Sequence, residues 1–370
     1  MGGEMRKVWY IADHCVSPLG VGGSTNFDAV VGGRSGLLET RIGRNSGFIA
    51  STIETLAAGE GHTRFEKLSL ATAEDFISGH QLPVDRTLLI VSTTKGNIEI
   101  LTENSEYHTR LSLHATAAYL AKSVGLVHSL VVSNACISGV LALITAKRLI
   151  ERRKFDHVFV LGTEVLSEFI VEGFQSLQAL SDEACRPFDI ARKGINLGEG
   201  AGIILLSGLP EIFDTTPLIE ITGCGTSNDA NHISGPSRNG DGLATAISRT
   251  LTSAKLHAKD MDAVCAHGTA TIYNDEMEAK AFRLTNLHNV PVYSLKGNFG
   301  HTLGGAGVIE TIIARHSLIR DVVPGTLGFN ERGVSEININ QHSKSFSQRR
   351  ILKTASGFGG CNAALVLEKV

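Results

Sequence analysis

One cysteine stands where a nucleophile would be expected. Cys136 lies between an apolar run, Leu130 to Ser133, that is typical of a buried strand and a helical pattern that begins near Ile137. A thiol at a helix N-terminus is close to the positive end of the helix dipole and to unpaired N–H groups, and both favour the thiolate. Ser138 and Gly139 keep the first turn small, so a substrate could approach closely. On this segment alone a buried structural cysteine remains an alternative.

A first histidine follows another predicted strand, Ala263 to Ala266. His267 leads into Gly268 and two hydroxyl residues, Thr269 and Thr271. A histidine at a strand end beside these small polar residues is poorly explained as a core residue. A hydrogen-bonded structural histidine remains the alternative.

A second histidine, His301, lies in a glycine-rich segment, Lys296 to Gly307. Five glycines in these twelve residues let the backbone approach another backbone or a ligand closely. Lys296 precedes His301, and Glu310 follows it near the start of a predicted helix, so a Lys–Glu pair could fix the orientation of the ring. A phosphate-binding loop is the alternative, but the spacing does not match GxxxxGK[ST].

Other kinds of site have less support. The run Gly357 to Gly360 is predicted to be a tight turn, and the run Gly198 to Gly202 is interpreted as a packing feature. No GxGxxG lies between a strand and a helix, so a dinucleotide site is not expected. The cysteines and histidines lack metal-ligand spacing, so no catalytic metal is expected.

One nucleophilic cysteine with two later histidines suits thioester chemistry. The cysteine would accept an acyl group, and the imidazoles would stabilise an enolate of a second thioester.

Composition sets the class of protein. The chain has 370 residues, 42% of them hydrophobic, which predicts a large buried core and excludes a disordered chain. The 34 basic and 37 acidic residues give no global case for binding nucleic acid. No apolar run approaches the ~20 residues of a membrane span, and the N-terminus does not resemble a signal peptide. The six cysteines form no CxxC pair, so we expect reduced thiols in a cytoplasmic protein.

Short apolar runs alternate with helical patterns along the chain, which predicts an α/β architecture. The runs read as buried strands at 88–92, 130–133, 158–161, 203–206, 218–222, 263–266, 292–295 and 363–367.

The chain is expected to divide near residue 210, where Ser207 to Pro217 is rich in glycine and proline. We predict one half over residues 1–210, carrying Cys136, and a second over 211–370, carrying both histidines. Gly139-Val140-Leu141 and Gly307-Val308-Ile309 each open a helix after a strand and a polar loop, which suggests a duplication. Duplicated α/β halves would stack their sheets around shared helices.

Several ordered motifs together resemble the elongating, Cys-His-His type of β-ketoacyl-[acyl-carrier-protein] synthase. The main motifs are Asn134 to Gly139, His267 to Thr271, Lys296 to His301 and Gly357 to Gly360. Supporting matches run nearly from end to end of the chain and include residues 17–20, 33–36, 93–96, 186–189 and 198–202, Asn274-Asp275 with Glu278, and Asp229 with His232.

This resemblance implies a thiolase-like fold, in which two similar halves form a five-layer αβαβα sandwich. It also implies a decarboxylative Claisen condensation. Cys136 would accept an acyl chain, and malonyl-acyl carrier protein would lose carbon dioxide and attack the Cys136 thioester, giving a 3-oxoacyl-acyl carrier protein. The pathway would be fatty acid, polyketide or aryl-polyene synthesis.

The resemblance also assigns roles to residues. His267 and His301 would polarise the malonyl thioester carbonyl, and Lys296, with Glu310 as its ionic partner, would support His301. The backbone N–H groups of Cys136 and Phe358 would form the oxyanion hole, and Phe358 would also act as a gate. Thr269 and Thr271 match positions that hydrogen-bond the phosphopantetheine arm. Ile195 stands where the family often has a phenylalanine that lines the acyl pocket.

The resemblance implies no cofactor beyond the phosphopantetheine of the carrier protein. It also implies that the protein forms a homodimer, or a heterodimer with a related subunit.

Initiating synthases carry Asn where this chain has His301, so an initiator is disfavoured. Thiolases carry a second active-site cysteine in the last segment, where this chain has Cys361 next to the glycine turn. Two alternatives remain open: a non-catalytic partner subunit like a chain-length factor, and a malonyl decarboxylase that does not condense.

Overall fold

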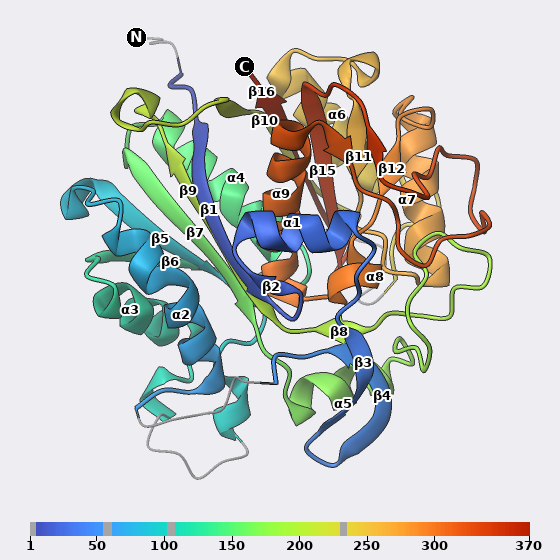
Figure 1. Cartoon of the computed structure of the whole chain (residues 1–370), viewed down its shortest axis with the longest axis horizontal. Helices are drawn as coiled ribbons and strands as arrows, with labels where there is room; N and C mark the ends of the chain where they lie inside the picture. Colours follow the sequence, from blue (N-terminus) through green and yellow to red (C-terminus); the bar gives the residue numbers. More distant parts are fainter. Residues whose placement is uncertain (1–4, 55–60, 102–107, 230–234) are drawn as a thin grey trace.

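Two five-stranded sheets organise the computed structural model, which describes residues 5–54, 61–101, 108–229 and 235–370 (Figure 1). The N-terminal sheet has the strand order β6 (His128–Val132), β5 (Thr87–Ser92), β7 (His157–Glu164), β9 (Gly200–Ser207) and β1 (Trp9–Ser17). The C-terminal sheet has the order β12 (Val292–Tyr293), β11 (Ala263–Cys265), β15 (Arg350–Gly357), β16 (Cys361–Lys369) and β10 (Ile219–Asn228).

The two sheets repeat one pairing pattern. In the N-terminal sheet β1, β9 and β7 are antiparallel neighbours, and β7, β5 and β6 are parallel ones. In the C-terminal sheet β10, β16 and β15 are antiparallel, and β15, β11 and β12 are parallel. A short antiparallel contact between β1 and β10 joins the two sheets edge to edge, with Trp9 opposite Glu220 and Tyr10 opposite Ile219. The division of the chain at residue 210 into two domains stays a prediction.

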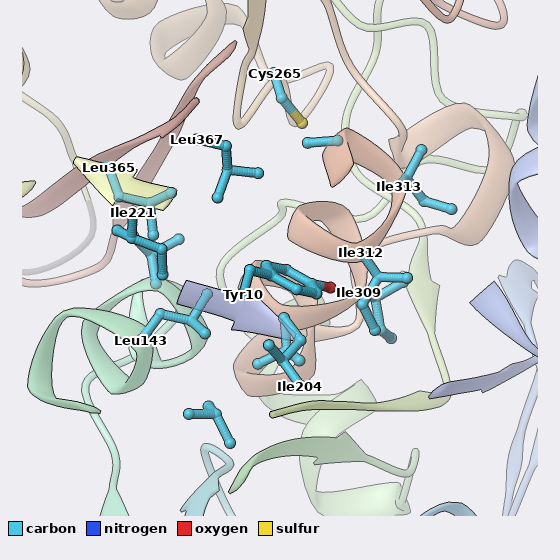
Figure 2. Packing of buried hydrophobic residues seen from close by; sticks show 14 of the residues in the cluster. Tyr10, Leu143, Ile204, Ile221, Cys265, Ile309, Ile312, Ile313, Leu365 and Leu367 are labelled. Atoms are coloured by element: carbon cyan, nitrogen blue, oxygen red, sulfur yellow. The ribbon is translucent and has the colours of Figure 1, made fainter. Parts of the chain in front are cut away.

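Helices form the other layers of the fold. Helices α4 (Ser138–Glu151) and α9 (Leu303–Arg320) lie between the sheets, and their apolar side chains share one core with the inner faces of both sheets. Figure 2 shows this core, where Leu143 of α4 and Ile309 of α9 lie near Tyr10 and Ile204 of one sheet and Leu365 of the other.

The outer faces of the sheets are covered in the same manner. Helices α2 (Arg64–Ser78) and α3 (Leu113–Ser123) cover the N-terminal sheet, with Phe65 and Leu120 in a second core. Helices α6 (Asp241–Ala254) and α7 (Ile272–Leu284) cover the C-terminal sheet, with Ile247 in a third core. The result is the five-layer αβαβα sandwich that the resemblance implied.

Helix α9 differs from an ordinary surface helix because both of its sides face a sheet. Residues around its whole circumference are buried, including Leu303, Ile309, Thr311 and Ala314. A helix that is apolar all round is typical of the interior of a large protein. Among the described residues, no helix combines the length and the apolar composition needed to cross a membrane.

The described residues also form further α-helices and shorter strands. They are β2 (Gly20–Val21), α1 (Gly23–Val31), β3 (Leu37–Ile42), β4 (Asn45–Ser51), α5 (Glu168–Ser176), β8 (Leu197–Gly198), α8 (Lys296–Phe299), β13 (Val322–Val323) and β14 (Lys344–Ser345). A small sheet of β3, β4 and β8 packs with α5 through Phe48, Leu166 and Ile170, next to the start of α9.

Candidate active site

Cys136 sits at a sharp turn between β6 and α4. The preceding residue, Ala135, has a φ of 45°, a conformation that is uncommon for a residue with a Cβ atom. The Ser138 hydroxyl accepts from the Asn134 N–H at 2.7 Å and donates to the Ala135 carbonyl at 2.6 Å. The sequence therefore supplies a small polar side chain that holds the strained turn and presents the thiol at the end of the helix.

The structure brings the predicted nucleophile and both predicted histidines together. One ligand-type atom from each of Cys136, His267 and His301 lies within 4.8 Å of the other two. The two imidazole rings meet edge to face, with centroids 5.1 Å apart and planes at 81°. All three side chains are buried. Residues from distant parts of the chain thus form one cluster.

His301 is held in one orientation by the start of α9. Its Nδ1 accepts the N–H of Leu303 at 3.2 Å, so the ring proton is on Nε2. Nε2 is buried and has no hydrogen-bond partner among the described residues. An unpaired buried donor is costly, and its position beside Cys136 makes it available to a substrate oxygen.

His267 is positioned by two buried carboxylates of α7. Glu278 accepts the N–H of His267 at 2.8 Å and that of Gly268 at 2.6 Å, and Asp275 accepts the N–H of Thr269 at 2.9 Å. These acids fix the loop that carries His267. The sequence motif contained them, but their role in holding the loop could not be read from the chain.

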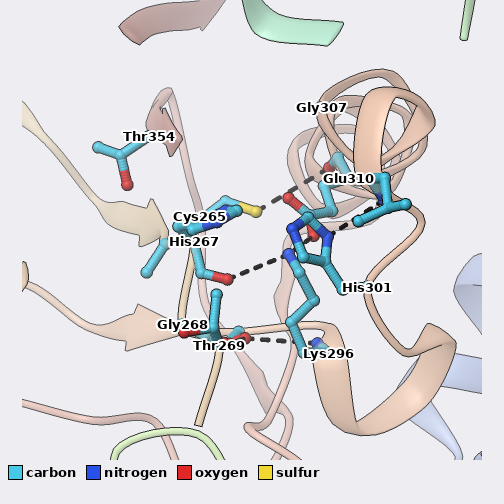
Figure 3. Close-up of polar contacts among 12 residues, drawn as sticks. Cys265, His267, Gly268, Thr269, Lys296, His301, Gly307, Glu310 and Thr354 are labelled. Carbon is cyan, nitrogen blue, oxygen red and sulfur yellow. Dashed lines mark hydrogen bonds and ion pairs between the residues drawn. The ribbon is translucent and has the colours of Figure 1, made fainter. Parts of the chain in front are cut away.

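Lys296, on α8, lies beneath the two histidines. Its Nζ donates to the His267 carbonyl at 3.1 Å and pairs with Glu310 of α9, as the close-up shows (Figure 3). Glu310 also pairs with a second buried lysine, Lys353 of β15, at 2.6 Å. Lys353 was not among the residues predicted from the sequence, although a lysine that directly follows the apolar residues Ile351 and Leu352 was an available signal.

Burial sets the protonation states of the cluster. The pKa values of His267 and His301 lie well below 6.5, because burial disfavours the charged ring and because Lys296 and Lys353 repel a further positive charge. Both rings are therefore neutral at neutral pH.

The backbone N–H groups near the helix end favour the thiolate of Cys136, but burial outweighs them in the free protein. Burial raises the pKa of Cys136 to about 11, because its effect is larger than the opposing effects of Lys296 and of two backbone N–H groups. Those N–H groups belong to Phe358 and to Cys136 itself, the pair that the resemblance assigned to the oxyanion hole. They act at the sulfur, where an acyl carbonyl would be attached.

A cavity of about 540 Å³ opens onto the cluster. It is lined by Cys136, His267 and His301, by four residues that were predicted to contact the substrate, and by several residues that were not predicted from the sequence. Lys296 and Glu310 do not line it. The predicted contact residues are Ile195, Thr269, Thr271 and Phe358, and the unselected ones include Phe174, Leu177, Gln178, Lys193, Tyr273 and Asn362.

The cavity wall has an aromatic and a polar part. The ring of Phe358 stacks on Phe174 of α5 with centroids 5.8 Å apart. The hydroxyls of Thr269 and Thr271 lie 2.9 Å apart. Asp229 and His232 were among the supporting matches to the family. Asp229 also lines the cavity, whereas His232 falls outside the described residues.

Cysteine and histidine are also zinc ligands, and the spatial cluster was not foreseen from spacing along the chain. Lys296 and Lys353 lie close to both histidines, however, and repel further positive charge there. The group therefore suits a reaction that develops negative charge better than it suits a metal ion.

Two family models match the chain. "Beta-ketoacyl synthase, N-terminal domain" matches residues 93–211, and "Beta-ketoacyl synthase, C-terminal domain" matches residues 218–330. The chain belongs to the beta-ketoacyl synthase family. Cys136 falls in the first match, and both histidines of the cluster fall in the second.

Curated relatives in this family are 3-oxoacyl-[acyl-carrier-protein] synthases. Synthase 2 of Rhizobium meliloti is 33% identical over 65% of this chain, and synthase 2 of Coxiella burnetii is 31% identical over 64%. The match spans 60% of the length of each of these two relatives. A putative mitochondrial synthase of Schizosaccharomyces pombe is 28% identical over 99% of both chains.

Solved ketosynthase structures share the fold. A ketosynthase from Xenorhabdus doucetiae, in complex with its chain length factor, superposes with a TM-score of 0.86 at 24% identity, covering 99% of this chain and 98% of that one. A beta-ketoacyl synthase from Burkholderia phymatum gives a TM-score of 0.87 at 24% identity, covering 99% and 100%.

Proposed function

We propose that this beta-ketoacyl synthase is a condensing enzyme that joins an acyl chain on Cys136 to a malonyl unit. The observation that carries the proposal is the meeting of the Cys136 sulfur with two neutral imidazoles in one buried cavity, where the Nε2–H of His301 has no partner among the described residues. The curated relatives named as 3-oxoacyl-[acyl-carrier-protein] synthases support the same assignment.

In the first step, Cys136 attacks the carbonyl carbon of an acyl thioester on a carrier protein. The new C–S bond forms to Cys136, the old one to the pantetheine sulfur breaks, and the Cys136 proton passes to the departing thiolate. The N–H groups of Cys136 and Phe358 stabilise the tetrahedral oxyanion. Because the free thiol has a raised pKa, the proton must leave as the sulfur attacks, and the neutral imidazole of His267, whose Nδ1 has no partner among the described residues, is a suitable relay.

In the second step, a malonyl thioester loses carbon dioxide. The electrons of the broken C–C bond move onto the thioester oxygen, which accepts hydrogen bonds from His267 and His301. The enolate carbon then attacks the acyl group on Cys136, and the released Cys136 thiolate takes up a proton from solvent. Neutral imidazoles suit this step because they donate hydrogen bonds without protonating the enolate.

The positions of these residues in the cavity wall support their proposed contact roles. Thr269 and Thr271 line it together and present hydroxyls to a pantetheine arm, while Ile195 shapes the acyl end and Phe358 gates the approach to Cys136. The substrates then bring phosphopantetheine themselves, and the protein needs no other cofactor. Six cysteines without a disulfide among the described residues support a cytoplasmic location.

The partners proposed for the chain are an acyl carrier protein and a second synthase subunit. One solved neighbour is a type II polyketide acyl-carrier protein in complex with its ketosynthase, and another is a ketosynthase in complex with its chain length factor. We expect a homodimer, with pairing to a related subunit as the alternative.

Intact mass spectrometry tests the proposal directly. The protein is incubated with a panel of acyl-carrier proteins, with and without malonyl-carrier protein, beside the Cys136→Ala variant. We expect an acyl adduct that requires Cys136 and that malonyl-carrier protein converts into a 3-oxoacyl product. Carbon dioxide release with no ketoacyl product would instead indicate a decarboxylase. A folded protein that takes no acyl group from any donor would indicate a non-catalytic partner subunit.

A further inference from the structure

Lys353 is a buried lysine that the mechanism above does not use. It lies in the middle of β15, next to β11, and its side chain is fully buried. Its Nζ donates to the Thr354 carbonyl at 2.7 Å and pairs with Glu310 at 2.6 Å. Burying an ammonium group is costly even when it is paired, so a lysine at this position calls for an explanation other than packing.

The pairing places two buried lysines at one carboxylate. Lys296 contacts Oε1 of Glu310 and Lys353 contacts Oε2, so two cations share one carboxylate. The pKa of Glu310 is lowered, and that of Lys353 is raised, so both groups are ionised at neutral pH. Cys265 of β11 and Glu278 of α7 also act on Lys353, and Lys353 in turn acts on both histidines. Burial raises the pKa of Glu278 to about 7, so this acid is only partly ionised at neutral pH. Asp275 of α7 and Glu164 of β7 are further buried acids beside the cluster.

The same lysine lies beside the strand end that carries His267. Its Nζ is 3.4 Å from the carbonyl oxygen of Ala266 and 3.5 Å from that of Cys265. Lys296 holds the next carbonyl, that of His267. The two lysines therefore contact three successive carbonyl oxygens of the segment that delivers the histidine to the cavity.

We propose that Lys353 is a positioning residue for the condensation, which places a positive charge behind His267 and His301 and fixes the strand end that carries His267. The inference rests on the proposed function and deepens it. The charge keeps both imidazoles neutral, as hydrogen-bond donors, and stabilises the enolate oxygen that they contact.

The test compares the wild type with Lys353→Met, which keeps a long unbranched side chain and removes the charge. We expect the rate of malonyl-carrier protein decarboxylation to fall about tenfold or more, with little change in KM. Losing a nearby cation raises the pKa of both imidazoles, so the acidic limb of the pH–rate profile should move up by about one pH unit. NMR titration of isotope-labelled histidines in the unliganded protein should show the same upward shift.

Other variants separate charge from structure. Lys353→Arg keeps the charge, so its imidazole titration should stay at the wild-type position even if its size lowers the rate. Lys369→Met is the matched control, because Lys369 pairs with Asp321 at 2.6 Å at the C-terminal end of α9, and it should change neither readout. Where Lys353→Met does not fold, Lys353→Gln replaces it, since an amide can still donate to the Thr354 carbonyl.

The outcomes are distinguishable. An unchanged histidine titration in a folded Lys353→Met protein would overturn the proposal and leave Lys353 a structural residue, even if the rate fell. If the wild type neither forms the acyl adduct nor decarboxylates malonyl-carrier protein, the proposed function fails. The titration, measured without substrate, still decides whether Lys353 sets the charge at the histidines.

Discussion

Gly139 of α4 and Gly307 of α9 lie against each other, so the two central helices cross backbone to backbone. A Cβ atom on Gly307 would lie 2.4 Å from the backbone nitrogen of Val140, and one on Gly139 would lie 2.8 Å from the Cα of Gly307. The crossing lies close to the starts of both helices, where Cys136 and His301 are found. The close approach of these two glycines therefore sets how near the nucleophile comes to the histidine.

The Gly307→Ala substitution should push the two helices apart. The added methyl would meet backbone that cannot rotate away, and overpacking of this kind typically costs about 1–3 kcal/mol. Denaturant unfolding measures the loss. Gly173→Ala is the matched control, because Gly173 also lies in a helix, α5, but nothing is within 4 Å of its added Cβ. The control should be neutral or stabilised by up to about 1 kcal/mol, and an equal effect of both substitutions would contradict the packing argument.

The same glycines show how far the sequence predicts the fold. The repeated segments Gly139-Val140-Leu141 and Gly307-Val308-Ile309 suggested a duplication, and the structure places them face to face at the centre. Each apolar run selected as a strand overlaps a strand of the structure, because buried strands read as continuous apolar segments. Strands β1 and β15 were missed because polar side chains such as His14 and Lys353 interrupt their apolar pattern.

The candidate site was predictable in its residue types and less so in its energetics. Cys136, His267, His301 and the Lys296–Glu310 pair were selected from motifs, and the fold brings them together. The direction of the Cys136 pKa shift was not predictable, since it depends on burial by residues that are remote along the chain. The cavity wall from α5 was likewise invisible, because Phe174 belongs to no recognisable motif.

The raised pKa of Cys136 predicts slow alkylation of the free protein. With a pKa of about 11, almost all of the thiol is protonated at pH 7, and the reactive thiolate increases about tenfold with each pH unit. Iodoacetamide modification, followed by peptide mass mapping of Cys136, should therefore accelerate steadily up to about pH 10. The Cys136→Ala variant gives the background from the other five cysteines. A rate that levels off below pH 8 would show that the nucleophile is already a thiolate at rest.

The two acids behind the His267 loop predict a pH dependence of stability. Burial raises the pKa of Glu278 to about 7 and that of Asp275 to about 6, above their values of 4.5 and 3.8 in an unfolded chain. The folded state then holds more protons than the unfolded state in this window. Stability contributed by these groups is therefore fully present below about pH 4 and falls as the pH rises to about 7.

Glu278→Gln removes one of these titrating groups, so the fall in the free energy of unfolding between pH 5 and pH 7 should become shallower. Urea unfolding at several pH values measures the slope in both proteins. The amide accepts at one atom only, so the variant should also be less stable at every pH because one N–H of the loop loses its acceptor. The slope is the test: parallel curves for the two proteins would mean that Glu278 does not titrate in this range.

The geometry of His301 predicts that the two steps of the reaction can be separated. Its free Nε2–H is available to the malonyl thioester oxygen, whereas acyl transfer relies on the Cys136 sulfur and the backbone N–H groups of Cys136 and Phe358. His301→Ala should therefore lower malonyl decarboxylation about 100-fold or more, the usual effect of losing one donor to a developing oxyanion. Formation of the acyl adduct on Cys136 should be retained within about tenfold.

Single-turnover mass measurements of the adduct and of carbon dioxide release give the two rates separately. His342→Ala, at an exposed histidine, controls for the loss of an imidazole elsewhere and should leave both rates unchanged. Loss of the acyl adduct in a folded His301→Ala protein would assign His301 to the activation of Cys136 instead. In that case His267 alone would face the enolate oxygen, and His267→Ala would then become the variant that blocks decarboxylation while sparing acylation.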